Sequence, residues 1–315
     1  MSDNDASSNP RYYWLLLFFK GIAMGAADVV PGVSGGTIAF ITGIYERLLK
    51  ALTMLHPLTL RVIVKQGFAV FWQVIDGRFL FTLFAGIIVS ILSLAKLINY
   101  ALDSYPIAVW SFFFGLVVSS VIYLIRQTPQ WRWQEFIAIA LGAGIAISIA
   151  VLRPAQLPDT WWMMMLSGFI AICAMILPGI SGSFILLLMG MYSVFIQALT
   201  ELNLLLLASF AVGCVLGLIV FSHILSCLLR HYLSTMLALL TGFLLGSLSV
   251  LWPWKQVLET SLDRHGETIA LVQTNISPMA YATLTNTNAQ LSTAILTACV
   301  GFLIVFLLDR LSIKQ

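Results

Sequence analysis

The sequence predicts an all-α polytopic membrane protein with two inverted-topology repeats, each a Pro-Gly-broken, re-entrant helical hairpin followed by three transmembrane helices. Composition, long apolar runs and an internal repeat lead to this prediction. Of 315 residues, 60% are hydrophobic and 9% charged. Soluble domains are about 45–50% apolar and about 25% charged, so a water-exposed globular enzyme is excluded. The net charge of +3 is too small to indicate a nucleic-acid partner.

The chain contains one segment twice. Gly21–Leu52 aligns without gaps with Gly168–Leu199, 147 positions later, and Pro31 aligns with Pro178. A second block of matches has an offset of 127 and pairs Gly86, Tyr105, Gly115 and Ser120 with Gly213, Tyr232, Gly242 and Ser247. The two halves are therefore predicted to be copies of one unit.

Three apolar runs follow each copy, and each run is about 20 residues long, enough to cross a hydrocarbon core of about 30 Å. The runs are 79–101, 107–125 and 135–152 in the first half, and 204–228, 233–251 and 292–308 in the second. A hairpin returns to the side it left, so an odd number of crossings separates the copies. The second copy is then inverted relative to the first, as in many secondary transporters.

This reading divides the chain into a cytoplasmic tail (1–11), a first repeat (12–152), a second repeat (153–310) and a cytoplasmic tail (311–315). The polar stretch 253–291 is expected to be an external loop with little regular structure. With both termini cytoplasmic, twelve basic residues lie inside: Arg11, Lys20, Arg47, Lys50, Arg61, Lys65, Arg78, Arg126, Arg132, Arg230, Arg310 and Lys314. Only Arg153, Lys255 and Arg264 lie outside, which fits the positive-inside rule.

Each copy carries a Pro-Gly pair that should break a helix inside the apolar zone, at Pro31-Gly32 and at Pro178-Gly179. A new helix can begin after each break, because Ser34 and Ser181 are good N-caps. The amides expected to be unpaired there belong to Gly35, Gly36, Thr37, Gly182 and Ser183. Such helix starts bind phosphate or carboxylate groups. The alternative is that these small residues only let helices pack closely.

Four ionisable residues near the breaks or inside spans are candidates for a coupling-ion or polar site, because charge is costly in a membrane: Asp28, Glu46, Lys96 and His223. Asp28 aligns with Met175, which suits a proton or sodium site on one side only, or hydrogen bonding to freed amides. Lys96 aligns with His223. The two are either a polar pair related by the repeat or two residues near helix ends. Arg47 is expected at the cytoplasmic rim, as a topology anchor and a headgroup contact, with Glu46 and Lys50 forming an i,i+4 pair.

A rival reading is an intramembrane serine hydrolase. Gly32-Val33-Ser34-Gly35-Gly36 fits the pattern G-x-S-x-G, and Ser181 has similar surroundings. A nucleophilic serine needs a base within hydrogen-bond reach, and His223 is the histidine that lies within a span. The serine is duplicated while the histidine is not, which disfavours catalysis.

The stretches ADVVPGVSGGTIAFITGIYERLL and LPGISGSFILLLMGMY resemble the bacterial family long labelled domain of unknown function 368, described as polyprenyl-phosphate transporters. The resemblance covers nearly the whole chain and implies a multi-pass protein of the bacterial inner membrane. It implies a translocase that returns undecaprenyl phosphate from the outer to the inner leaflet for cell-envelope synthesis, with no cofactor or metal. In the second motif Ser183 replaces the last glycine of the first motif, a departure from equivalence of the two anion sites.

Together, the residues and the resemblance give one hypothesis. The two serine-glycine segments cradle the phosphate, Asp28 couples a proton or sodium ion, and Arg47 engages phosphate at the cytoplasmic exit. Rocking of one repeat against the other alternates access. A transporter of a small soluble anion, or a cation antiporter, remains the third reading. The coupling ion, the direction of net transport, the prenyl length and the oligomeric state stay open.

Overall fold

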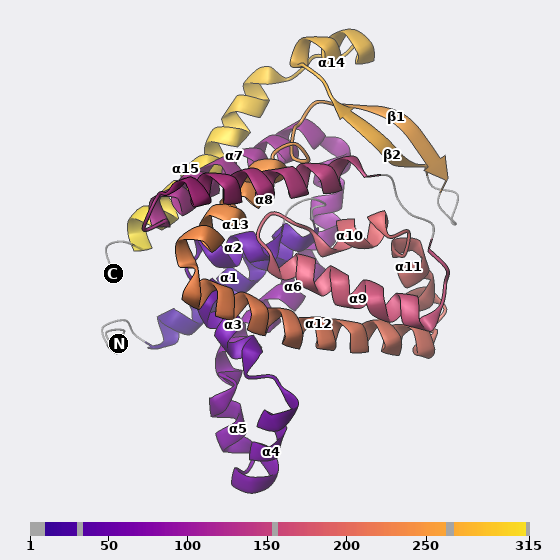
Figure 1. The fold of residues 1–315 in the computed structure, drawn as a ribbon. Coiled ribbons are helices and arrows are strands. Elements are labelled where there is room, and N and C mark those ends of the chain that lie inside the picture. The colour runs from indigo at the N-terminus through magenta and orange to yellow at the C-terminus, as the bar shows by residue number, and fades with distance from the viewer. Residues whose placement is uncertain (1–9, 30–33, 153–156, 263–267, 313–315) are drawn as a thin grey trace.

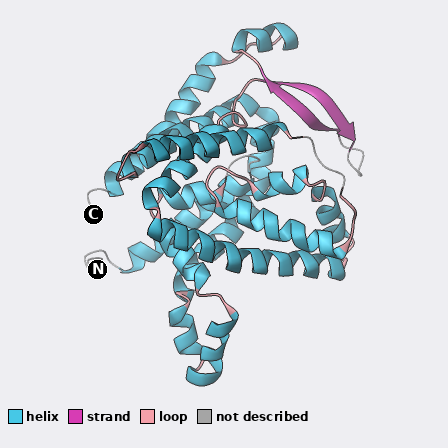
Figure 2. Ribbon diagram, in the orientation of Figure 1, coloured by secondary structure: helices cyan, strands magenta, loops and turns pink. Residues whose placement is uncertain are grey.

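The computed structural model describes residues 10–29, 34–152, 157–262 and 268–312, and it is mostly helical (Figures 1 and 2). The first half contains α1 (Pro10–Val29), α2 (Gly35–Ile41), α3 (Tyr45–Thr53), α4 (Pro57–Gln66), α5 (Phe68–Val74), α6 (Gly77–Ser104), α7 (Pro106–Gln127) and α8 (Trp133–Val151). The second half contains α9 (Trp161–Ile176), α10 (Gly182–Leu188), α11 (Tyr192–Thr200), α12 (Leu204–His231), α13 (Leu233–Ser247), β1 (Lys255–Leu262), β2 (Thr268–Asn275), α14 (Pro278–Thr285) and α15 (Leu291–Ser312).

All six predicted apolar spans are helical. Within the described residues, α6, α7, α8 and α12 are long and apolar enough to cross a membrane, and α10 with α11 forms a pair bent by 104° that passes the same test together. α13 ends at Ser247, four residues before the predicted end, and a turn leads into Trp252 and Pro253. A proline disfavours helical backbone in the residue before it, which accounts for a stop ahead of Pro253.

The helices pair in the same way in both halves. α1 packs along α6, and α9 packs along α12. The third long helix of each half crosses to the other half, so that α8 packs on α13 and α15 packs on α7. This exchange ties the two halves into one body, with both ends of the chain on one side of the view in Figure 1.

Equivalent glycines make these pairings possible. A Cβ atom added at Gly21 would lie 2.3 Å from the carbonyl oxygen of Leu83, and one at Gly168 would lie 2.4 Å from that of Phe210. These contacts join positions that the sequence repeat aligns. Only glycine lets the two backbones come so close, a common device in membrane helix packing.

Glycines allow the same close approach in the two crossed pairs, at positions related by a third sequence offset. A Cβ atom at Gly142 of α8 would lie 2.3 Å from the carbonyl oxygen of Leu239, and one at Gly301 of α15 would lie 2.1 Å from that of Phe112. Gly142 and Gly301 are 159 positions apart. The sequence comparison missed this third block because the stretch 253–291 separates α13 from α15 and changes the offset.

Two stretches outside the predicted spans have regular structure. The stretch 253–291 was predicted to have little regular structure, and this is wrong: β1 and β2 form an antiparallel hairpin in which Lys255 pairs with Asn275, and α14 follows. Between Thr53 and Arg78, α4 and α5 project from the body (Figure 1).

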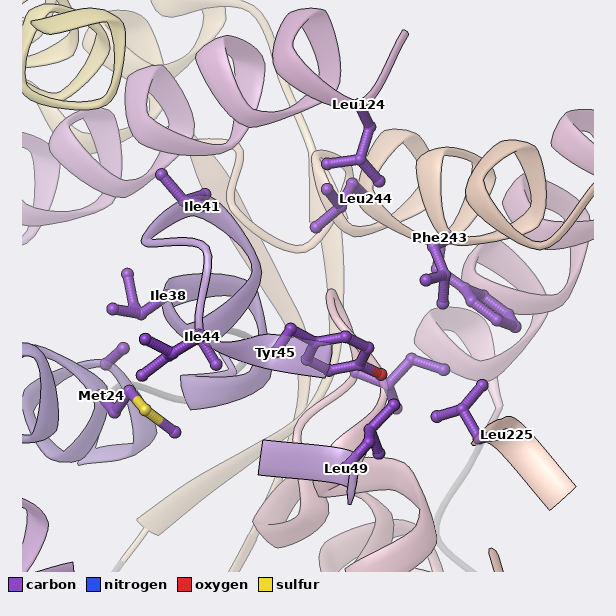
Figure 3. Packing of buried hydrophobic residues seen from close by; sticks show 14 of the residues in the cluster. Met24, Ile38, Ile41, Ile44, Tyr45, Leu49, Leu124, Leu225, Phe243 and Leu244 are labelled. Carbon is purple, nitrogen blue, oxygen red and sulfur yellow. The ribbon is translucent and has the colours of Figure 1, made fainter. Parts of the chain in front are cut away.

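The core joins the two halves of the chain. Tyr45 and Leu49 of α3 pack with Leu225 of α12 and with Phe243 and Leu244 of α13, and all five are buried (Figure 3). We call the side that carries both chain ends and the turn between α7 and α8 the termini face, and the side that carries β1 and β2 the hairpin face (Figure 1).

Candidate functional site

The two Pro-Gly motifs contact each other. The Ser34 hydroxyl donates to the carbonyl oxygen of Met175 at 3.1 Å, and that oxygen belongs to the last turn of α9. The amide of Gly179 donates to the Thr37 hydroxyl at 3.0 Å. The Tyr45 hydroxyl donates to the carbonyl oxygen of Ile176 at 3.0 Å. The last carbonyls of a helix have no partner within it, so the first motif satisfies groups that the second break leaves open.

The second break has the predicted place and geometry. α9 ends at Ile176, α10 begins at Gly182, and Gly179 has a φ of +85°, a left-handed conformation that glycine adopts without steric cost. In the first motif, Val29 ends α1 and Gly35 begins α2. The predicted break residues Pro31 and Gly32 lie outside the described residues.

The first helix start does not offer unpaired amides, and in this respect the expectation is wrong. The amide of Gly35 donates to Oδ1 of Asp28 at 2.6 Å. The amide of Gly36 donates to the Ser34 hydroxyl oxygen at 3.1 Å, and that of Thr37 to the Ser34 carbonyl oxygen at 2.9 Å. A carboxylate of the chain itself thus holds the place that we assigned to phosphate, because burial favours the nearest acceptor for an orphan amide.

Fewer amides at the second helix start, that of α10, have a hydrogen-bond acceptor. The Ser181 hydroxyl lies 2.9 Å from that of Ser183 and accepts a long hydrogen bond of 3.5 Å from the amide of Phe184. Within the described residues, the amides of Gly182 and Ser183 have no hydrogen-bond acceptor. The two helix starts are therefore not equivalent.

An apolar cleft of about 80 Å³ runs between α1, α3, α6, α9 and α12 to the first motif. Its lining is Met24, Asp28, Gly36, Tyr45, Leu48, Leu49, Leu52, Leu83, Phe84, Ile87, Ile172, Met175, Ile176 and Leu218. Asp28 is its one charged residue. Oδ2 of Asp28 is buried and has no hydrogen-bond partner among the described residues. The cleft is thus an apolar groove with a buried carboxylate oxygen at one end.

A larger cavity of about 720 Å³, which we call the charged chamber, lies between α3, the end of α5 and the end of α12. It is lined by Glu46, Arg47, Leu49, Lys50, Ala51, Met54, Gln73, Val74, Asp76, Ser226, Leu229 and Arg230. Three of these side chains are basic and two are acidic, so the chamber has a small excess of positive charge. Leu49 lines both the chamber and the apolar cleft, which places a charged space directly beside an apolar one.

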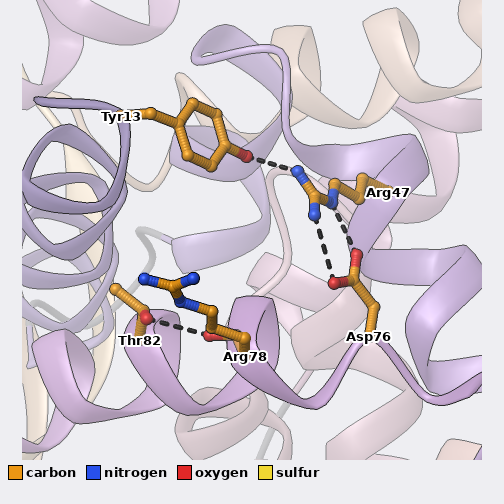
Figure 4. Close-up of polar contacts among 5 residues, drawn as sticks. All are labelled: Tyr13, Arg47, Asp76, Arg78 and Thr82. Atoms are coloured by element: carbon orange, nitrogen blue, oxygen red, sulfur yellow. Dashed lines mark hydrogen bonds and ion pairs between the residues drawn. The ribbon is translucent and has the colours of Figure 1, made fainter. Parts of the chain in front are cut away.

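Arg47 is held in the chamber wall by several contacts (Figure 4). Its Nε donates to Oδ2 of Asp76 at 2.7 Å and its Nη2 to Oδ1 at 3.1 Å, a two-point ion pair. Its Nη1 donates to the Tyr13 hydroxyl, and the guanidinium lies 4.6 Å from the centre of the Phe79 ring. Asp76 has a left-handed φ of 50°, one of four non-glycine residues with positive φ in the described chain. A two-point pair fixes the orientation of the arginine as well as its position.

The other predicted polar residues do not gather at the motifs. Glu46 lines the chamber, but no ion pair joins it to Lys50 among the described residues. The His223 ring lies 6.0 Å from that of His56, and its Nδ1 is 2.7 Å from the carbonyl oxygen of Ile219. Lys96 lies in α6, and its side chain is not among those that the structure describes.

The geometry gives the serine-hydrolase reading no support. A serine nucleophile needs its base at hydrogen-bond distance. The described partners of the Ser34 hydroxyl are backbone groups, and the Ser181 hydroxyl contacts Ser183 and a backbone amide. His223 instead contacts Ile219 and His56.

Sequence reasoning did not assign a site role to Asp76, Tyr13, Tyr45 or Arg230. Asp76 is the one acidic residue between Arg47 and Asp103, and it directly precedes a glycine and a long span, which is the signal that could have drawn attention to it. Tyr45 and Arg230 carried no such signal, because only the packing of α3 against α12 brings them to the cavities.

Comparisons with known proteins give the family. The family model described as VCA0040-like, undecaprenyl phosphate translocase-like, matches residues 24–269. A polyprenyl-phosphate transporter of Vibrio cholerae serotype O1 is 48% identical over 301 residues, which cover 96% of this chain and 98% of that protein. A polyprenyl-phosphate transporter of Staphylococcus aureus is 30% identical over 272 residues, which cover 77% of this chain and 87% of that protein.

No solved structure matches this chain with significance. The family model spans both Pro-Gly motifs, the charged chamber and the apolar cleft, and the Vibrio cholerae relative matches almost end to end. This chain belongs to the VCA0040-like family of undecaprenyl phosphate translocase-like proteins.

Proposed function

We propose that this protein moves undecaprenyl phosphate, or a closely related polyprenyl phosphate, from the outer to the inner leaflet of the bacterial cytoplasmic membrane. The observation that carries the proposal is the junction at Leu49 between a charged chamber and an apolar cleft. A lipid phosphate has a headgroup of charge about −1.5 to −2 and a long apolar tail. It needs both kinds of space side by side.

The chamber supplies the charge for the headgroup. Lys50 and Arg230 are exposed, and Arg47 stands between them and the core in a fixed orientation. Acidic Glu46 and Asp76 reduce the positive field, so the headgroup is held without being trapped. Release into a leaflet requires such moderate binding, because a site that binds too tightly slows the last step.

The cleft supplies the path for the tail. Its lining is apolar except for Asp28 and Gly36, and Phe84 and Met175 are partly exposed at its mouth. A tail too long to enclose can lie there against lipid while the headgroup remains in the chamber. Burial of each CH₂ group contributes about 0.8 kcal/mol, so even a short stretch of tail stabilises binding.

The orientation in the membrane follows from charge. The chamber is bordered by the end of α12, which lies on the termini face together with the end of α7 and both chain termini. Arg126 and Arg230 belong to these two helix ends, and under the positive-inside rule they support a cytoplasmic placement of this face. The equivalent contacts of Gly21 and Gly168 support two copies of one unit, and the odd number of crossings between them supports inversion.

The conformation supports alternating access. The charged chamber measures about 720 Å³, whereas a cleft at the second motif, between the far ends of α8 and α13, measures about 20 Å³. About 10–15 Å³ is enough for only one water molecule, so the second space is nearly closed. The difference in volume supports an inward-facing conformation in this proposal, in which rocking of the halves opens the other side.

Asp28 is the coupling site in this proposal. One carboxylate oxygen holds the start of α2 and the other is buried without a partner among the described residues. Binding a proton or a sodium ion at that second oxygen would neutralise a charge that is costly at this depth. Phosphate arriving at α2 would compete with the carboxylate for the same amide, which links ion and lipid binding.

The test uses purified protein in liposomes with labelled undecaprenyl phosphate in one leaflet. We expect its appearance in the other leaflet to be faster than in empty liposomes. Labelled inorganic phosphate in a parallel experiment tests the small-anion reading. Uptake of inorganic phosphate without movement of the lipid would overturn the proposal.

A further inference from the structure

A basic residue outside the chamber stands at the start of the hairpin. Lys255 is the first residue of β1, and its Nζ donates to the carbonyl oxygen of Val250. The same nitrogen lies 4.3 Å from the centre of the Trp110 ring, on α7. Both contacts tie the ammonium group to the body of the protein rather than leaving it in solvent.

Among the residues that the structure describes, this ammonium group has no acidic partner. Within the described residues no carboxylate forms an ion pair with Lys255, and its neighbours are Trp110, Val250 and its cross-strand partner Asn275. Burial lowers the pKa of Lys255 to about 8. Taking a cation out of water without an anion is costly, so a position that keeps one calls for an anion from elsewhere.

Two tryptophans anchor the start of β1 next to Lys255. Trp252 and Trp254 stack edge to face with ring centres 5.5 Å apart. Their Nε1 atoms donate to the carbonyl oxygens of Ile276 and Ala289. Trp254 is 6% exposed and packs with Ile107 and Ala294, so the tryptophan pair fixes the start of β1 and with it the position of the Lys255 ammonium group.

Lys255 also adjoins the second motif. Val250, whose carbonyl oxygen accepts its hydrogen bond, lines the small cleft of about 20 Å³. Gly179, Ser181 and Ser247 line the same cleft. Val250 thus lies between the Lys255 ammonium group and the break between α9 and α10.

We infer that Lys255 is the first protein group to bind the phosphate of the lipid on the hairpin face, before the cleft at Ser181 opens to receive it. In this role Lys255 is the counterpart of Arg47 in the charged chamber. The inference rests on the proposed function, because it assigns the entry side of the same substrate. The ligand is a phosphate monoester on a lipid, supplied from the leaflet that the hairpin face meets.

The experiment compares four proteins in liposomes of known orientation: the wild type, Lys255→Gln, Lys255→Arg and Lys65→Gln. Lys65 is exposed on α4 and is the matched control for loss of one positive charge. Labelled undecaprenyl phosphate is added to the leaflet at the hairpin face, and the rate is measured against its concentration. Loss of a charge-assisted hydrogen bond should raise the half-saturating concentration of Lys255→Gln about tenfold or more, with little change in the maximal rate.

The pH profile separates a binding role from a structural one. Wild-type loading should fall as pH rises through about 8, since Lys255 loses its proton there. Lys255→Arg should stay active above that pH, because arginine remains charged. Because Lys255→Arg keeps the charge, it still tests the inference if Lys255→Gln fails to fold.

The outcomes distinguish the two proposals. No lipid movement by the wild type would overturn the proposed function. Lipid movement by the wild type, with equal concentration dependence in Lys255→Gln, would overturn the role of Lys255 alone. An equal loss in Lys65→Gln would also overturn it, since any surface charge would then serve.

Discussion

The Ser34 hydroxyl lies 3.1 Å from the carbonyl oxygen of Met175 and donates to it, across 141 positions of sequence. This one contact joins the start of α2 to the end of α9. The same oxygen of Ser34 accepts from the amide of Gly36. Ser34 therefore caps one broken helix and satisfies the other, a double role that its repeat counterpart Ser181 lacks among the described contacts.

Replacing Ser34 by alanine should consequently cost more than the same change at Ser181. Loss of an N-cap typically costs about 0.5–2 kcal/mol, and Ser34→Ala also leaves a buried carbonyl without its donor. We expect a lower melting temperature for Ser34→Ala than for Ser181→Ala, and a partial loss of transport in both. Thermal unfolding in detergent and the liposome assay measure the two effects. Complete loss of activity with unchanged stability would instead favour a nucleophilic serine.

Bulky residues at the paired glycines should block the site. A Cβ atom at Gly35 would lie 2.5 Å from Oδ2 of Asp28, and one at Gly182 would lie 2.7 Å from the carbonyl oxygen of Ala171. The double variant Gly35→Leu, Gly182→Leu should fail to recycle the lipid carrier in a depleted host. Gly144→Leu is the control, since a Cβ atom there meets nothing within 4 Å. Full activity of the double variant at normal expression would show that the two Pro-Gly motifs are not part of the transport path.

The ion pair between Arg47 and Asp76 should matter more for transport than for stability. The two side chains are 40% and 34% exposed, and partly exposed pairs contribute at most about 1 kcal/mol. Loss of a charged phosphate contact in Arg47→Gln should slow transport about tenfold or more. Arg47→Lys should rescue little, because lysine cannot form the two-point contact.

Asp76→Asn provides the comparison for that experiment. Asparagine keeps one acceptor oxygen but loses the charge, so Arg47 should be less firmly oriented while the chamber becomes more positive. Because a more positive chamber favours the anionic headgroup, we expect the transport rate to depend less on lipid concentration. We also expect release of the lipid to be slower. Equal rates in the wild type, Arg47→Gln and Asp76→Asn would remove the chamber from the transport path.

Asparagine at position 28 should separate coupling from folding. Asp28→Asn retains an oxygen that can accept from the amide of Gly35, but it cannot carry a proton or bind sodium as an anion. Wild-type transport should respond to an imposed pH or sodium gradient, and the variant should lose most of this response while remaining folded. A response of the same size in the variant would mean that coupling lies elsewhere.

Stability should rise at high pH because of Lys255. Its pKa falls from 10.5 to about 8 on folding, so between these two values the unfolded chain holds a proton that the folded protein has released. Proton release then favours the folded state, by up to about 3 kcal/mol above pH 10.5 relative to below pH 8. Melting curves across this window should rise in the wild type relative to Lys255→Met. Parallel curves for the two proteins would contradict the prediction.

Much of the fold could be predicted from the local sequence. Apolar length located six helices, of which α6, α7, α8 and α12 are long and apolar enough to cross a membrane among the described residues, and the aligned Pro-Gly pairs located the second break at Gly179. The strands β1 and β2 were not predicted, because a short polar stretch rich in Thr and Asn shows little alternation of apolar and polar residues. Their regular structure depends on pairing with each other and on the hydrogen bonds that Trp252 and Trp254 donate to the carbonyl oxygens of Ile276 and Ala289.

The sequence by itself predicted apolar helices long enough to cross a membrane, a segment present twice, and the break of the second copy at Pro178 and Gly179. These properties are local, since they follow from hydrophobic length, repetition and backbone sterics. Only the tertiary structure decided which groups occupy the breaks. Asp28 reaches the amide of Gly35, and Arg47 finds Asp76 29 positions away, because helix packing sets distances that residue spacing does not contain.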